Sequence, residues 1–232
     1  MSVISFEILN KVNLKTAGKS IESYSTQNRP WLNQFDNFFN NTRLQASPVQ
    51  RMTDLLNIVR YNGWNMNRQG QCASILKDIH TGIITDDQLC NFWDLVDKIP
   101  NLSLCELPGV DNSVIDLLIG SFTKLRKILS GWHSSAGSVC FFTKVVLMFN
   151  WGHTPAYDTR IRSILGVNNS ISDKDLIDSL VDIGIWLRRF ERQFDIDFVR
   201  FSTDVMRKAS GLELKQLPSG RGFDMMLFSL QS

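Results

Sequence analysis

Hydrophobic positions recur at helical spacing in segment after segment of the chain, and no segment alternates at the period of a β-strand. Two segments show the pattern well, one that begins at Ser47-Pro48 and one that follows Ser172. Their apolar faces consist of Met52, Leu55, Leu56 and Val59 in the first, and of Leu176, Leu180, Ile183, Leu187 and Phe190 in the second. A period near 3.6 residues is typical of amphipathic helices, so the sequence predicts an all-α fold.

Polar residues at the segment boundaries predict where helices begin. Thr85 and Gln88 are spaced as a capping box, and Ser172 can cap a helix that has Asp175 in its first turn. We expect one domain over residues 1–232. It consists of an N-terminal arm or helix (1–46), an N-terminal helical lobe (47–111) and a helical region (112–232) that starts with a helix over 112–129.

Composition limits the function only weakly. A hydrophobic content of 43% in 232 residues is enough for a packed core, and a net charge of +2 neither favours nor excludes a nucleic-acid partner. The four cysteines form no CxxC pair and the three histidines stand apart, so we expect reduced thiols, no metal and no cofactor. No apolar run reaches the ~20 residues of a membrane helix, and we expect a soluble, cytoplasmic monomer.

The most informative stretch is FFTKVVLMFNWGHTPAYDTRIRSIL, residues 141–165. Residues 138–150 are apolar nearly all round, as in the central helix of a bundle, yet Lys144 lies in their middle. Gly152 and Pro155 interrupt the helix and let the chain turn back. Asp158 then falls at the N-terminus of the next helix, where a carboxylate meets free backbone amides. We therefore expect Lys144 and Asp158 to reach the same pocket.

Two interpretations of this pair stay open on the residues alone. An apolar environment favours the neutral amine of a lysine, the form that attacks an electrophilic carbon, and an aspartate nearby can stabilise a positively charged sugar-like transition state. In the alternative interpretation, Asp158 is an ordinary helix cap and Lys144 is its buried salt-bridge partner.

The order of residues around this pair resembles a known family. An aromatic-Thr-Lys sequence in an apolar helix, followed by His-Thr-Pro-x-Tyr-Asp-x-Arg, is similar to the helix-hairpin-helix superfamily of DNA glycosylases, in particular its 8-oxoguanine-glycosylase-like branch. The ending LPSGRGFDMMLFSL resembles the Arg-x-x-Asp-Met-x-Leu ending of that branch, with Arg221, Asp224 and Met225 at the matching positions. The resemblance implies a two-lobed helical bundle and covers roughly residues 112–230.

The resemblance also implies a function and a set of site residues. The protein would excise a damaged or modified base, flipped out of duplex DNA, with Lys144 and Asp158 as catalytic residues. It would cleave the strand as well if Lys144 attacks the sugar. The base pocket would be formed by aromatic residues and one acid, namely Trp132, Phe141, Trp151, Tyr157, Phe223 and Asp224. The DNA backbone would be bound by Lys124, Arg126, Lys127, Ser135, Gly137, Ser138, Arg160 and Arg162.

One departure from the family concerns the segment before the lysine helix. SGWHSSAGS, residues 130–138, stands where the family has its Leu-Pro-Gly-Val-Gly hairpin. Its glycines and serines can bring backbone amides to a phosphate, or it is a plain loop with Ser135 or Ser138 as helix cap. Two rival functions remain, a catalytically silent DNA-binding or anti-phage defence protein on the same scaffold and a helical protein-interaction domain.

Overall fold

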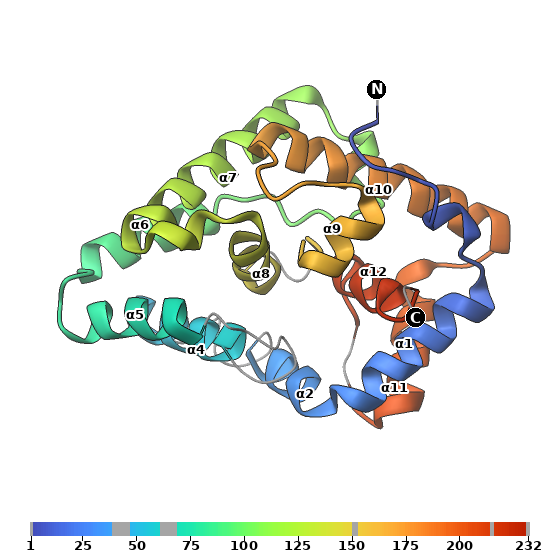
Figure 1. Cartoon of the computed structure of the whole chain (residues 1–232), viewed down its shortest axis with the longest axis horizontal. Helices are drawn as coiled ribbons and strands as arrows, with labels where there is room; N and C mark the ends of the chain where they lie inside the picture. Colours follow the sequence, from blue (N-terminus) through green and yellow to red (C-terminus); the bar gives the residue numbers. More distant parts are fainter. Residues whose placement is uncertain (1, 39–46, 61–68, 150–152, 214–215, 231–232) are drawn as a thin grey trace.

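Helices form the regular structure of this protein. The structure is a computed structural model, which describes residues 2–38, 47–60, 69–149, 153–213 and 216–230. These residues form α-helices and short 3-10 helices, and none of them lies in a β-strand. The all-α prediction is therefore confirmed, and Figure 1 shows the helices arranged around α8, which lies near the centre.

The first group of helices follows the chain from residue 29 to residue 96. α4 (Pro48–Arg60) packs against α5 (Gln69–His80) and α6 (Asp86–Val96), and α2 (Arg29–Asn37) packs against α4. The capping box predicted at the start of α6 is confirmed, because the Thr85 side chain accepts from the Gln88 amide while the Gln88 side chain accepts from the Thr85 amide.

A long helix and a buried one connect this group to the rest of the molecule. α7 (Asn112–Trp132) packs on α6. It is followed by a short 3-10 helix, η4 (Ser134–Gly137), and then by α8 (Val139–Phe149). Every side chain from residue 139 to residue 148 is buried. This agrees with a helix that is apolar nearly all round and has protein on every side.

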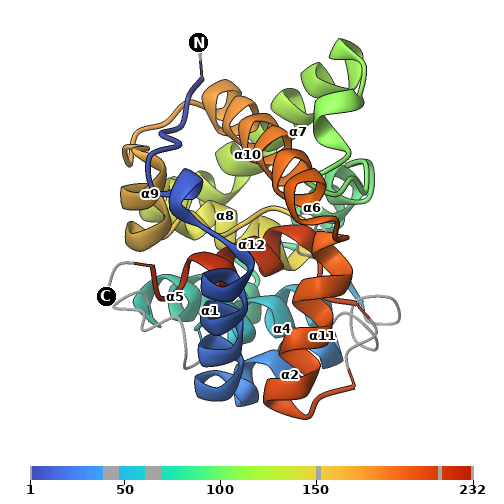
Figure 2. The ribbon, with the colours of Figure 1, turned by 90° about the vertical axis from the view of Figure 1, so that its right-hand side faces the viewer.

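The C-terminal helices make up the second group. They are α9 (Thr159–Leu165), α10 (Asp173–Phe194), α11 (Phe198–Ser210) and α12 (Ser219–Leu227), and α10 lies against α7. The N-terminal helix α1 (Leu14–Gln27) belongs to this group, since it packs against α11 and α12 (Figures 1 and 2).

Long-range hydrogen bonds fix α1 in this position. The Ser20 hydroxyl donates to the carbonyl of Met225 at 2.8 Å and accepts from the amide of Ser229 at 2.9 Å. Ser20 is fully buried, so its bond to the Met225 carbonyl lies away from water. The segment expected as an arm or a helix thus contains helices α1 and α2 in its described part, and residues 39–46 lie outside the described residues.

The close packing of α10 on the preceding loop requires a glycine. A Cβ atom built on Gly184 would lie 2.1 Å from the carbonyl oxygen of Leu104 and 2.9 Å from the ring of Pro108. The 3-10 helix η3 (Leu107–Gly109) can approach α10 only because residue 184 has no side chain. Ser172 caps α10 by accepting from the Asp175 amide, as predicted.

Candidate active site

One hydrogen bond joins the lysine helix to the segment that precedes Asp158. Thr143 lies on α8 and is buried, and its Oγ1 atom accepts from the Tyr157 amide at 2.8 Å while donating to the Val139 carbonyl at 2.8 Å. The residue before Lys144 therefore touches the residue before Asp158. A hydroxyl inside an otherwise apolar helix is the sequence signal for this contact, and the sequence interpretation did not give Thr143 a role.

Asp158 is the N-cap of α9, as predicted. Its Oδ1 atom accepts from the Ile161 amide at 3.0 Å, and its own amide donates to the Ala156 carbonyl at 2.8 Å. The second carboxylate oxygen has no hydrogen-bond partner among the described residues, and the side chain is only half-buried. One oxygen of Asp158 thus holds the helix and the other remains available for chemistry.

Lys144 lies in the interior, with a side chain that is 3% exposed. Its charge reaches Cys72 on α5, where it lowers the pKa of the thiol against the larger effect of burial, which raises that pKa to about 12. The ion pairs among the described residues do not include one between Lys144 and Asp158. The bond between Thr143 and Tyr157 brings the two elements together, but no salt bridge of 4.0 Å or less joins Lys144 directly to Asp158.

Asp224 holds the backbone in front of Asp158. Both of its carboxylate oxygens lie 3.1 Å from the Ala156 amide nitrogen, and Oδ2 accepts from Nη1 of Arg221 at 3.1 Å. Burial raises the pKa of Asp224 to about 7, although Arg221 and the Ala156 amide lower it, and the charge of Asp158 raises it further. Sequence interpretation assigned Asp224 to the base pocket, whereas its contacts in the structure are those of a backbone anchor.

The aromatic residues predicted for the base pocket take part in packing. Phe141, Tyr157 and Phe223 are fully buried. The Tyr157 hydroxyl lies 2.5 Å from the Ser179 hydroxyl, and burial raises its pKa above the usual range. Trp132 is half-buried, with its ring 5.4 Å from the ring of Phe92. Trp151 lies outside the described residues.

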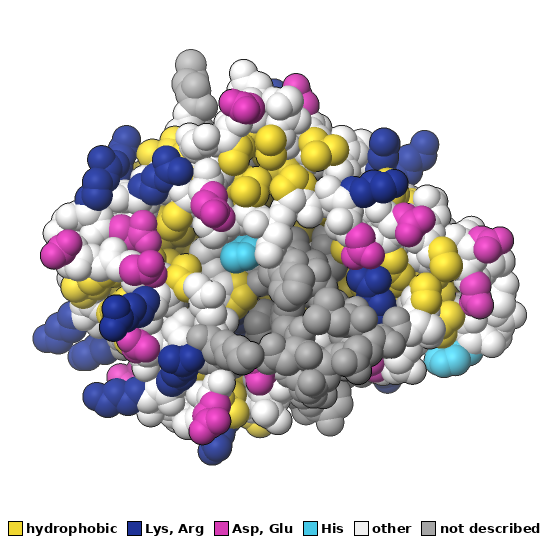
Figure 3. All heavy atoms as spheres, turned by 180° about the vertical axis from the view of Figure 1, so that it is seen from behind, with side chains coloured by type: hydrophobic (Ala, Val, Ile, Leu, Met, Phe, Trp, Pro, Cys, Tyr) yellow, Lys and Arg dark blue, Asp and Glu magenta, His cyan; other side chains and the backbone are white. Residues whose placement is uncertain are grey.

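The predicted DNA-backbone residues separate into exposed and internal side chains. Lys124 and Lys127 are exposed on α7, whereas Arg162 is half-buried with a buried Nε atom. Arg160 is exposed and lies over the ring of Phe228 at 4.8 Å, where it also donates to the Phe228 carbonyl. In the face shown in Figure 3, the Lys and Arg side chains are spread among acidic ones rather than gathered in one patch.

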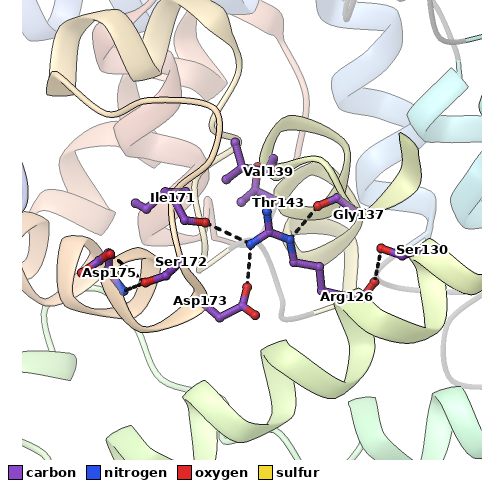
Figure 4. Close-up of polar contacts among 9 residues, drawn as sticks. All are labelled: Arg126, Ser130, Gly137, Val139, Thr143, Ile171, Ser172, Asp173 and Asp175. Carbon is purple, nitrogen blue, oxygen red and sulfur yellow. Dashed lines mark hydrogen bonds and ion pairs between the residues drawn. The ribbon is translucent and has the colours of Figure 1, made fainter. Parts of the chain in front are cut away.

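Arg126 fixes the segment that replaces the family's hairpin. Its guanidinium donates to the carbonyl of Gly137 at 2.6 Å and to the carbonyl of Ile171 at 3.1 Å, and pairs with Asp173 at 2.7 Å (Figure 4). A Cβ atom on Gly137 would lie 1.9 Å from the hydroxyl of Ser130, so the segment packs tightly on α7. Arg126 therefore acts as an internal support of the loop between α7 and α8.

The serines of this segment also make internal contacts. The Ser135 hydroxyl lies 2.9 Å from Nδ1 of His133 and accepts from the side chain of Gln71. The Ser138 carbonyl accepts from the Phe142 amide at 2.9 Å, in the first turn of α8. Ser135 thus connects the loop to α5, and the backbone of Ser138 begins the first turn of α8. The phosphate-binding role of the segment stays a prediction.

Comparisons with known proteins identify no relative of this chain. No family model matches it, and neither does any curated protein or solved structure. Among the described residues, no group of three His, Cys, Asp or Glu side chains could hold a metal ion, and no helix is both long and apolar enough to span a bilayer. All four cysteines are free.

Proposed function

We propose that this protein is a DNA glycosylase that excises a damaged or modified base, built on the two-lobed helical bundle of the helix-hairpin-helix superfamily. The observation that carries the proposal is the bond from the Tyr157 amide to Thr143 Oγ1. It places the start of the Asp158 helix against the helix that contains Lys144. A buried amine and a partly exposed carboxylate on adjoining elements can supply a nucleophile and stabilisation of positive charge for cleavage of an N-glycosidic bond.

Asp158 has the environment that its proposed role needs. Its Oδ1 atom is fixed by the Ile161 amide, so the carboxylate keeps one orientation, and its other oxygen can face a positively charged sugar. The same oxygen can accept a proton from the attacking group. The exposed lysines of α7, Lys124 and Lys127, would bind DNA phosphates. Their contribution to the affinity for DNA should fall as salt is added.

Lys144 determines which of two reactions follows. In the first, the neutral amine forms a bond to C1′ while the bond from C1′ to the base breaks, and the base leaves with the electron pair. The amine then loses a proton, the sugar ring opens to a Schiff base, and removal of a C2′ proton expels the 3′ phosphate. In the second, water attacks C1′ and Lys144 only maintains the pocket.

A borohydride trapping experiment tests the proposal and separates the two reactions. The protein is incubated with duplexes that contain 8-oxoguanine, uracil, alkylated bases or phage-type modified bases. A trapped adduct that is absent from Lys144→Ala supports the first reaction, and base release without an adduct supports the second. Lys208→Ala, an exposed lysine on α11, is the matched control and should behave as the unmodified protein.

Asp158→Asn is the sharpest variant, because asparagine is also a good N-cap and keeps the bond to the Ile161 amide. Base release should fall by about 100-fold or more while the fold is retained. If no substrate releases a base, the enzyme proposal is wrong. Binding to DNA at low salt would then leave the catalytically silent DNA-binding protein as the explanation, and its absence would leave the protein-interaction domain.

A further inference from the structure

The ion pair between Arg221 and Asp224 is buried in the interior of the C-terminal helices. Their side chains are 3% and 6% exposed, and the Arg221 guanidinium lies 4.4 Å above the ring of Tyr24 on α1. A buried ion pair adds little stability, because the loss of hydration offsets most of the attraction between the charges. Its presence beside the candidate site therefore suggests a role other than stability.

The contacts of Asp224 identify this role. The chain runs Thr154-Pro155-Ala156-Tyr157-Asp158, and proline has no amide hydrogen. The Ala156 amide is held by Asp224 from α12, and the next amide, that of Tyr157, is held by Thr143 from α8. Two successive amides are thus fixed from two different helices. The amide of Asp158 then folds back onto the Ala156 carbonyl, so each amide of this turn has a partner.

We propose that Asp224, held by Arg221, is a positioning residue that fixes the backbone of residues 156–158 and thereby the orientation of the Asp158 carboxylate. Asp224 acts through the Ala156 amide, and no contact with substrate is required of it. The part of this inference that concerns catalysis rests on the proposed function, whereas the part that concerns the backbone does not.

The charges around Asp224 give the inference a pH dependence. Two charged groups affect its titration, namely Arg221 on its own helix, which lowers the pKa, and Asp158 at the start of α9, which raises it. Tyr24 of α1 faces the guanidinium of Arg221, and the buried Tyr157 side chain senses the charge of Asp224. Because the pKa of Asp224 is raised to about 7, the carboxylate gains a proton as the pH falls through neutrality. The ion pair with Arg221 then weakens, and the hydrogen bond from the Ala156 amide to Asp224 changes over the same pH range.

Hydrogen exchange measured by mass spectrometry tests the backbone part on the full chain, with no substrate. Asp224→Ala should raise the exchange of peptides that cover 154–160 by at least about tenfold, because it removes a hydrogen bond to a charged group. Asp182→Ala is the matched control. Its carboxylate accepts from the Val3 amide at 2.8 Å, so its loss should raise exchange near residues 2–5 and leave 154–160 unchanged.

Asp224→Asn keeps a side-chain oxygen that can accept from Ala156 but cannot titrate, which makes it the conservative variant. Exchange of 154–160, corrected for the intrinsic effect of pH, should change between pH 6 and 8 in the unmodified protein and stay level in this variant. Exchange that rises equally over the whole chain in Asp224→Ala, or that matches Asp182→Ala at 154–160, would overturn the inference.

Turnover measurements address the catalytic part. If the protein releases a base, Asp224→Ala should lower kcat at least tenfold and leave KM within about twofold, since Asp224 acts on Asp158 and not on DNA. An unchanged kcat would overturn the positioning role. If the unmodified protein releases no base, the proposed function fails, and the exchange result still decides whether Asp224 fixes the backbone.

Discussion

Replacement of Thr143 by valine tests the bond that assembles the candidate site. Valine has the same branched shape as threonine but no acceptor, so Thr143→Val leaves the buried Tyr157 amide without a partner. An unsatisfied buried donor costs about 1–3 kcal/mol. The second bond of Thr143, to the Val139 carbonyl, lies within α8, whose backbone bonds remain, so its loss adds little. We expect the free energy of unfolding to fall by about 2 kcal/mol.

The control for this prediction lies on α4. The Oγ1 atom of Thr53 is buried and has no hydrogen-bond partner among the described residues. Thr53→Val therefore removes a hydroxyl that makes no bond, and the free energy of unfolding should stay level or rise. Both values come from guanidinium unfolding followed by circular dichroism, with the slope of the transition compared to exclude a change in cooperativity. Equal stabilities of the two variants would show that the bond between Thr143 and Tyr157 does not hold the site together.

Two further predictions concern packing and pH. Gly184→Ala should lower the free energy of unfolding by about 1–3 kcal/mol, because the new Cβ atom would meet the Leu104 carbonyl at 2.1 Å. Gly120→Ala on α7 is the control, since no atom lies within 4 Å of its Cβ position, and it should raise the free energy of unfolding by up to about 1 kcal/mol. Thermal unfolding of both variants checks this, and a Gly184→Ala variant as stable as the unmodified protein would contradict it. Burial lowers the pKa of His153 from 6.5 to about 4, so the unfolded chain gains a proton before the folded one and stability should fall by about 3 kcal/mol between pH 7 and pH 4. His153→Gln should remove that part of the acid sensitivity in denaturant titrations at the two pH values, and an unchanged difference between them would contradict the assignment.

Local signals account for what the sequence predicted well. The caps of α6 and α10, and the capping role of Asp158, depend on residues three positions apart, so their spacing is visible in the sequence. The burial of α8 follows from its apolar character on all sides, which leaves no face for water.

Long-range contacts account for what the sequence did not predict. The bond from Ala156 to Asp224 spans 68 positions, and the pairing of Arg126 with Asp173 spans 47. In neither bond does the sequence around one residue indicate which residue is its partner. The sequence alone cannot show that Asp224 holds a backbone amide or that Arg126 supports a loop. Their expected roles in the base pocket and at the DNA backbone stay predictions.

The position of α1 has a consequence for the synthesis of the protein. Ser20 bonds to Met225, 205 positions later, and within its group α1 packs mainly on α11 and α12, so α1 stays without these partners until the ribosome has made the C-terminal helices. The same late helix supplies Asp224, the side chain that holds Ala156. A nascent chain can therefore contain α8 and α9 well before the orientation of Asp158 is fixed. The candidate site is complete only after α12 has packed against α1.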